Sequence, residues 1–184
     1  MKKSYIILGS IALLVIVLFM SYSSSYNTAV SLQETVDEAW GNVGASYQRR
    51  ADLIPQLVAT VKGAAANERG ILTEVTQARA GIVNAKTPQD MELMGKKINT
   101  AINLAFEAYP QIRSTENFTG LQVQLEGTEN RINKARQDYN ETIKEYNAHI
   151  RGLFNSMLLN SVTFPRKNAF AAAAGSEVAP KVIF

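Results

Sequence analysis

The longest repeating pattern in the chain is TENFTGLQVQLEGTENRINKARQDYNETIKEYNAHIRGL, residues 115–153. Its apolar side chains recur at steps of three and four residues, which places them on one face of an α-helix. Thr128 and Thr142 are the polar members of this face, and each hydroxyl can bond to a carbonyl group of its own helix. The pattern predicts one long helix over 115–158. The residues of its apolar face are Phe118, Leu121, Leu125, Thr128, Ile132, Ala135, Tyr139, Thr142, Tyr146, Ile150 and Leu153.

The same spacing occurs three more times upstream, and strand-like alternation is absent there. It predicts a long helix over 27–62, a shorter one after Gly63, and a third that begins at Thr87-Pro88 and ends at Tyr109-Pro110. Asp90, three residues after Thr87, is placed to complete a capping box. The three apolar faces are Val36, Trp40, Val43, Tyr47, Ala51, Ile54, Val58 and Val61; Ile71, Val75, Ala78 and Ile82; and Met91, Met94, Ile98, Ala101 and Ala105.

Pro55 lies inside the first of these helices and costs roughly 3 kcal/mol in a helix interior. Either the helix continues with a kink, or it restarts with Asp52 as its N-cap and Pro55 in the first turn. The apolar spacing keeps its phase across Pro55, which favours the kink.

Residues 5–22, YIILGSIALLVIVLFMSY, carry no charge and would form about 27 Å of helix, close to the ~30 Å hydrocarbon core of a bilayer. The alternative is a cleaved signal peptide, but the apolar run is long for one and no clear A-x-A site follows. We therefore expect an uncleaved single-pass anchor. Lys2 and Lys3 precede it and the next basic residue is Arg49, so the N-terminus is expected in the cytoplasm. The anchor includes Tyr5, Leu13, Leu14, Phe19 and Tyr22.

Short connections make neighbouring helices antiparallel, so the predicted fold is all-α. It consists of an N-terminal transmembrane helix over 1–26 and an antiparallel four-helix bundle over 27–160, with helices 1 and 4 long and helices 2 and 3 shorter. An irregular tail over 161–184 follows. We expect the end of the bundle and the tail to lie near the lipid surface, or alternatively to close the base of the bundle. The apolar residues concerned are Phe154, Leu158, Leu159, Val162, Phe164 and Phe170, and the basic ones are Arg151, Arg166 and Lys167.

The composition disfavours most enzyme classes. The 184 residues include no cysteine and one histidine, which excludes a thiol nucleophile and a multi-histidine metal site. His149 follows Glu145 by four residues, but two ligands do not close a metal site, so a solvated or capping role is expected. The net charge of +3 becomes nearly zero without Lys2 and Lys3, which argues against nucleic acid. We expect no enzymatic activity, no cofactor, no metal and no small-molecule substrate.

The charges beside the apolar faces have a pattern of their own. Arg49, Arg50 and Asp52 border the face of the first bundle helix, and Glu126 and Glu129 occupy the last helix. Pairing between facing helices would fix their register more than it would add stability. A strip that binds a partner protein is the alternative interpretation.

Several motifs resemble the LemA family over nearly the whole chain. They are Val36-Asp37-Glu38-Ala39-Trp40, Gln48-Arg49-Arg50-Ala51-Asp52-Leu53-Ile54-Pro55-Gln56-Leu57-Val58, Glu116-Asn117-Phe118, Leu125-Glu126-Gly127-Thr128-Glu129-Asn130-Arg131-Ile132, the pairs Tyr139-Asn140 and Tyr146-Asn147, and Ala179-Pro180-Lys181-Val182. The family usually has Phe-Pro where this chain has Leu153-Phe154. The resemblance implies a bacterial single-pass membrane protein with a four-helix bundle and supplies no catalytic residues.

Two classes of function follow. In the first, anchored bundles self-associate into a homo-oligomeric scaffold or shell that organises the bilayer of the bacterial cytoplasmic (inner) membrane, with the bundle on the periplasmic or extracellular side. In the second, the bundle is an adaptor that docks another envelope protein, such as a membrane protease or a signalling receptor, through the strip around Arg49, Arg50 and Asp52.

Overall fold

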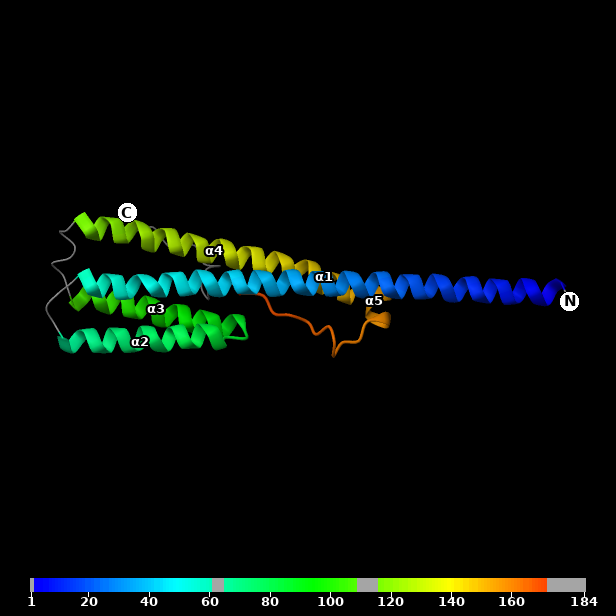
Figure 1. The fold of residues 1–184 in the computed structure, drawn as a ribbon, viewed down its shortest axis with the longest axis horizontal. Coiled ribbons are helices and arrows are strands. Elements are labelled where there is room, and N and C mark those ends of the chain that lie inside the picture. The colour runs from blue at the N-terminus through cyan, green and yellow to red at the C-terminus, as the bar shows by residue number, and fades with distance from the viewer. Residues whose placement is uncertain (1, 61–64, 109–115, 172–184) are drawn as a thin grey trace, which may run out of the picture. The chain divides into compact units, whose positions relative to one another are not determined.

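The computed structural model describes residues 2–60, 65–108 and 116–171. They form five helices: α1 (Lys2–Thr60), α2 (Ala65–Asn84), α3 (Pro88–Ala108), α4 (Glu116–Arg151) and α5 (Leu153–Leu158). No strand occurs in these three ranges, so the all-α prediction is confirmed (Figure 1). The chain divides into two compact units. The packing of the four long helices as a single bundle stays a prediction.

Unit 1 comprises residues 1–41 and 141–167. It contains the N-terminal part of α1, the C-terminal end of α4, the short helix α5 and the segment that follows. Val36, the first residue of the apolar face predicted for α1, is 1% exposed in this unit. Tyr146 of α4 is fully buried in the same unit. The N-terminal end of α1 projects beyond α5 (Figure 1).

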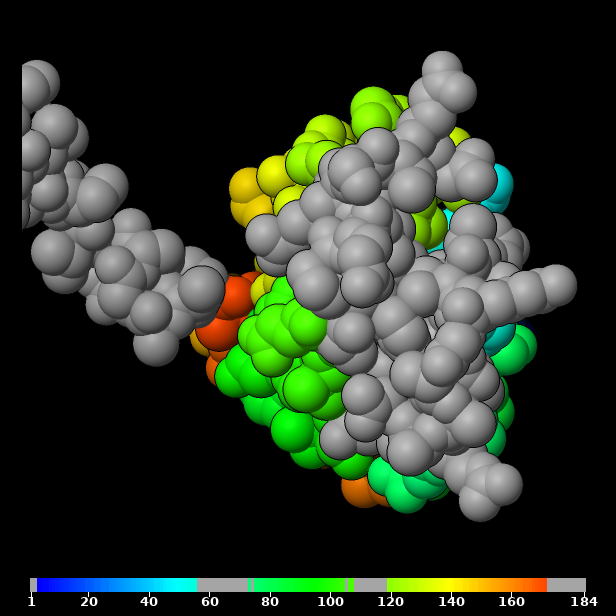
Figure 2. Space-filling model, turned by 90° about the vertical axis from the view of Figure 1, so that its left-hand side faces the viewer, coloured from blue at the N-terminus to red at the C-terminus, as the bar shows by residue number. Residues whose placement is uncertain are grey.

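Unit 2 comprises residues 42–140 and 168–184, of which the structure describes those outside the gaps given above. α2 and α3 pack against each other as a hairpin. Figure 2 shows the side chains of α4 in yellow-green at the top of the view and those of α2 and α3 in green below. The predicted faces supply the core, which includes Val43, Ala51, Ile54, Val75, Ala78, Ile82, Met91, Ile98, Ala101, Leu125 and Ile132.

α1 runs without interruption through both the predicted anchor boundary at residue 26 and Pro55. The continuation across Pro55 is therefore confirmed, and the alternative in which the helix restarts at Asp52 is wrong. Ala51 and Ile54 are both buried beside the proline. This burial on one continuous face offsets the hydrogen bond that the proline cannot donate.

The start of α3 follows the predicted capping box. The backbone N–H of Asp90 donates to Thr87 Oγ1 at 3.2 Å, and the backbone N–H of Thr87 donates back to Asp90 Oδ2 at 3.2 Å. The Thr87 hydroxyl also donates to Asp90 Oδ2 at 2.7 Å, which lowers the pKa of the Asp90 carboxyl group.

The prediction that the last long helix continues to residue 158 is wrong. α4 ends at Arg151, and Gly152 has a non-helical backbone with ψ of 144°. The Asn155 Nδ2 atom donates to the backbone carbonyl of His149 at 2.8 Å, and the backbone N–H of Gly152 donates to the same oxygen at 3.2 Å. These two bonds satisfy a carbonyl group in the last turn of α4. Leu153 consequently leaves the apolar face and is 76% exposed.

Parts of the predicted pattern lie outside the residues whose side chains the structure describes. They are Val58, Val61, Ile71, Ala105, Phe118 and the tail beyond residue 171. The part of the tail from Pro165 to Ala171 is irregular, as predicted.

Candidate functional site

The N-terminal stretch of α1 presents its apolar side chains to the outside. Leu13, Leu14 and Phe19 are 64%, 59% and 69% exposed. Tyr5 and Tyr22, at the two ends of the stretch, are also exposed. This part of α1 is long and apolar enough to cross a membrane.

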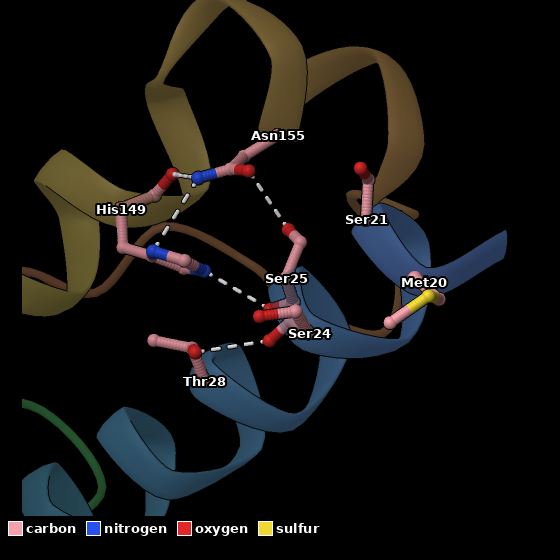
Figure 3. A pocket seen from close by; sticks show the side chains of 7 residues that line it. All are labelled: Met20, Ser21, Ser24, Ser25, Thr28, His149 and Asn155. Carbon is pink, nitrogen blue, oxygen red and sulfur yellow. Dashed lines mark hydrogen bonds between the residues drawn. The ribbon is translucent and has the colours of Figure 1, made fainter. Parts of the chain in front are cut away.

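Directly after this stretch, a polar network joins α1 to the end of α4 (Figure 3). The ring Nε2 atom of His149 lies 3.0 Å from the backbone carbonyl oxygen of Ser25, so Nε2 carries the proton and donates it. Nδ1 then accepts from Asn155 Nδ2 at 3.3 Å. The Ser25 hydroxyl donates to Asn155 Oδ1 at 2.8 Å, which closes the network. The histidine therefore links two helices, and its hydrogen bonds are met by protein groups.

The segment after α5 returns along α4 in unit 1. The Tyr146 hydroxyl donates to the carbonyl oxygen of Pro165 at 3.0 Å. The Asn147 side chain bonds to both backbone groups of Lys167, at 2.9 Å and 3.2 Å. Lys167 also pairs with Asp37 of α1 at 2.6 Å. These contacts fasten an extended segment that has no hydrogen-bonded secondary structure of its own.

The residues predicted near the lipid surface fall into two groups. Phe164 and Phe170 are buried in protein, Phe164 against the ring of Tyr26 in unit 1 and Phe170 against that of Tyr139 in unit 2. This burial favours the alternative in which these two rings serve packing. Phe154 is 75% exposed and Leu158 is half-buried, so α5 retains an apolar outer side.

In unit 2 the structure brings together one pair of the predicted polar strip. The Arg50 side chain is 12% exposed and lies 3.0 Å from Glu129. Arg50 also donates to the backbone carbonyl of Leu125 at 2.8 Å and to the Asn99 side chain at 3.1 Å. Asp52 instead pairs with Arg79 of α2, at 3.0 Å. Arg50 therefore connects α1 to both α3 and α4.

The other two members of the strip stay apart. Arg49 and Glu126 are exposed, and neither forms an ion pair with another residue in the part of the chain that the structure describes. Of the predicted strip, Arg50 is therefore largely buried and paired, Asp52 and Glu129 are paired but about half exposed, and Arg49 and Glu126 are exposed without an ion pair among the described residues.

A second arginine, which the sequence argument did not single out for a role, lies in the same unit. Arg136 pairs with Glu92 of α3 at 2.7 Å, and its guanidinium group lies 4.7 Å from the centre of the Phe170 ring. Burial raises the pKa of the adjacent Tyr47, partly offset by the positive charge of Arg136. The sequence signal was its position next to Ala135 of the predicted apolar face, since Arg50 also adjoins a face residue, Ala51.

Next to Arg136, α4 binds the extended segment again. The Asn140 side chain bonds to both backbone groups of Phe170, at 3.1 Å and 2.8 Å. The Tyr139 hydroxyl donates to the carbonyl oxygen of Asn168 at 3.4 Å. The dipeptide Tyr-Asn therefore performs the same task at 139–140 in unit 2 and at 146–147 in unit 1.

The helices and their packing define a class of protein: an all-helical chain whose first helix carries an exposed stretch long enough to cross a membrane. The described residues hold no group of three or more His, Cys, Asp or Glu side chains placed to bind a metal ion. The model of the LemA family matches residues 39–184, and the chain belongs to this family. No curated protein matches the chain.

Proposed function

We propose that this chain is a non-enzymatic, single-pass protein of the bacterial cytoplasmic membrane that self-assembles into an oligomeric scaffold organising the bilayer. The observation that carries the proposal is the continuity of α1, which is one helix from its exposed apolar stretch to its buried face. Because the helix does not break between the two stretches, a span held in the bilayer also sets the position of the buried face that follows it. Lys2 and Lys3 orient the N-terminus toward the cytoplasm.

A face of α4 supports self-association. Gly120 and Gly127 are seven residues apart, and a Cβ atom added at either would meet no atom within 4 Å. Val123, between them on the same face, is 64% exposed. A glycine inside a helix costs about 1 kcal/mol relative to alanine, and no contact among the described residues accounts for these two. Two glycines and an exposed valine on one face of α4 leave room for a second helix, which suits a neighbouring copy of the chain.

Electron microscopy of the full-length protein, extracted with native lipid and accompanied by a mass measurement, tests this function. Large symmetric particles are the expected result. The variant Gly120→Gln/Gly127→Gln should reduce the mass to that of single chains while its helix content stays high, because glutamine is a good helix former. Val83→Gln, at an exposed position on α2, is the matched control. Monodisperse single chains of the unmodified protein at all concentrations would contradict the scaffold.

The free charges Arg49 and Glu126 favour a second candidate function, an adaptor that docks another envelope protein. Arg49→Glu should then abolish co-purification of that protein and leave the helix content unchanged, because Arg49 is exposed. An unchanged set of co-purifying proteins would contradict the adaptor.

A further inference from the structure

The short helix α5 has two different sides. Leu153, Phe154 and Met157 are 76%, 75% and 80% exposed. At 100° per residue these three positions share one side of the helix, and Asn155 and Leu159 lie on the other. Asn155 bonds to Ser25, and Leu159 is buried. The inner side of α5 is therefore fixed to α1 in unit 1, whereas its outer side is apolar and open.

The attachment points of α5 and of the segment after it lie directly beyond the exposed apolar stretch of α1. Asn155 bonds to Ser25 and Phe164 packs on Tyr26, which are three and four residues after Tyr22. At 1.5 Å per residue these positions are about 5 Å beyond the end of that stretch. A lipid headgroup layer is about 5–8 Å thick on each side of the hydrocarbon core. The contacts hold α5 at the depth of the headgroups if residues 5–22 span the bilayer.

We propose that the outer side of α5, together with Val162, inserts into the boundary between headgroups and acyl chains of the bilayer that α1 crosses. This inference rests on the proposed membrane anchoring. Val162 is 86% exposed on the turn between α5 and Phe164. Arg151 and Arg166 are exposed on either side of this turn. Apolar side chains flanked by arginines are typical of interfacial segments, whose apolar face enters about 5–10 Å into the bilayer and whose charges contact anionic headgroups.

The geometry gives the protein a second contact with its membrane. A single span leaves a helix free to tilt and to rotate about its axis, and its orientation is set by packing and interfacial anchors. The hydrogen bonds of Asn155 and His149 to Ser25 hold α5 on one side of α1. Insertion of α5 into the same leaflet therefore fixes the side toward which α1 can tilt.

The 184 residues include no cysteine, which permits a direct test with single labelled positions. Phe154→Cys and Val162→Cys, each in the full chain, would be labelled with a polarity-sensitive dye and reconstituted into vesicles of mixed zwitterionic and anionic lipid. Glu145→Cys, exposed on α4 in unit 1, is the matched control. Leu14→Cys reports the anchor itself. Lipids with a quencher at shallow or deep positions along the chain then locate each dye.

The expected result is blue-shifted emission at positions 154 and 162 with several-fold stronger quenching by the shallow quencher than at position 145. Leu14→Cys should respond most to the deep quencher. Water-like emission at 154 and 162 with a lipid-exposed Leu14→Cys would overturn this inference and leave the anchor intact. Water-like emission at Leu14→Cys would contradict the anchor. A blue shift at 154 that disappears on dilution to one protein per vesicle would show that a second copy covers α5, and would also overturn the inference.

Discussion

Two stretches of the same helix, α1, behave in opposite ways. Between Tyr5 and Tyr22 the large apolar side chains are all exposed, from 73% to 41%. Between Ala29 and Ile54 a residue on every turn or two is buried, and the intervening ones are exposed or part-buried. The helix is continuous, so secondary structure does not distinguish the stretches. The second stretch packs against other helices of the chain. The apolar side chains of the first stretch need an apolar environment, such as a lipid bilayer, that the described residues do not provide.

The largest expected effect contrasts a core residue with an anchor residue. Ile54, 1% exposed, loses its packing in Ile54→Ala, which should lower the free energy of unfolding by about 3 kcal/mol. Leu14→Ala should leave it within ~0.5 kcal/mol, because the Leu14 side chain is 59% exposed. Chemical denaturation of both variants in the same detergent measures the difference. Equal losses would break the comparison between the two stretches.

A smaller contrast separates two adjacent arginines of the packed stretch. Arg50→Ala removes the hydrogen bonds of a largely buried guanidinium group to the Leu125 carbonyl and the Asn99 side chain, together with its ion pair to Glu129, and should cost about 2 kcal/mol. Arg49→Ala should cost less than ~0.5 kcal/mol, because Arg49 is exposed and has no ion pair among the described residues. Thermal unfolding followed by circular dichroism is the measurement. A larger loss of stability in Arg49→Ala than in Arg50→Ala would show that the contacts of Arg50 do not fix the register of α1.

The next expected effect concerns the contacts that hold the extended segment after α5. Asn147→Ala removes two hydrogen bonds to the backbone of Lys167 and should destabilise the protein by about 1.5 kcal/mol. Hydrogen exchange at the amide of Lys167 should accelerate at the same time, since that N–H loses its acceptor. Asn133→Ala, exposed on α4, is the control and should change neither quantity. An unaltered exchange rate in Asn147→Ala would mean that other contacts hold the segment.

The smallest effect concerns the start of α3. Thr87→Ala removes the cap and should cost about 1 kcal/mol. The Thr87 hydroxyl lowers the pKa of Asp90, so the ionised carboxylate stabilises the folded state. That stabilisation is complete above the ordinary pKa of 3.8 and is lost as the pH falls through the lower pKa of the folded protein. Unfolding measured from pH 7 to pH 2 should show a smaller difference between the two proteins at the acid end.

The apolar spacing predicted which residues are buried where helices pack along their length. Val36, Val43 and Ala51 are buried as expected, and the capping box at Thr87 forms. These features depend on neighbours within a few residues or on a regular period, and both are visible in a sequence.

The features that sequence analysis missed depend on contacts between distant segments. α4 ends at Arg151 because Asn155 folds back onto the carbonyl of His149, an arrangement that periodicity does not encode. The repeated Tyr-Asn pair was visible, but its role was not. Seven helical residues rise about 10.5 Å and three extended residues span about 10 Å. This match explains why pairs seven apart on α4 bind the extended segment at intervals of three residues.

The most direct test of the account is the reactivity of single cysteines placed one at a time from Tyr5 to Val30 in intact membranes. The account predicts protection from a water-soluble thiol reagent at every position between Ile6 and Phe19. Beyond Ser25 reactivity should become periodic, with Ala29→Cys unreactive and Val30→Cys reactive, because Ala29 is fully buried and Val30 is 38% exposed. Periodic reactivity within the first stretch, or a mature protein that lacks it, would contradict the claim that α1 passes from lipid into protein as one helix.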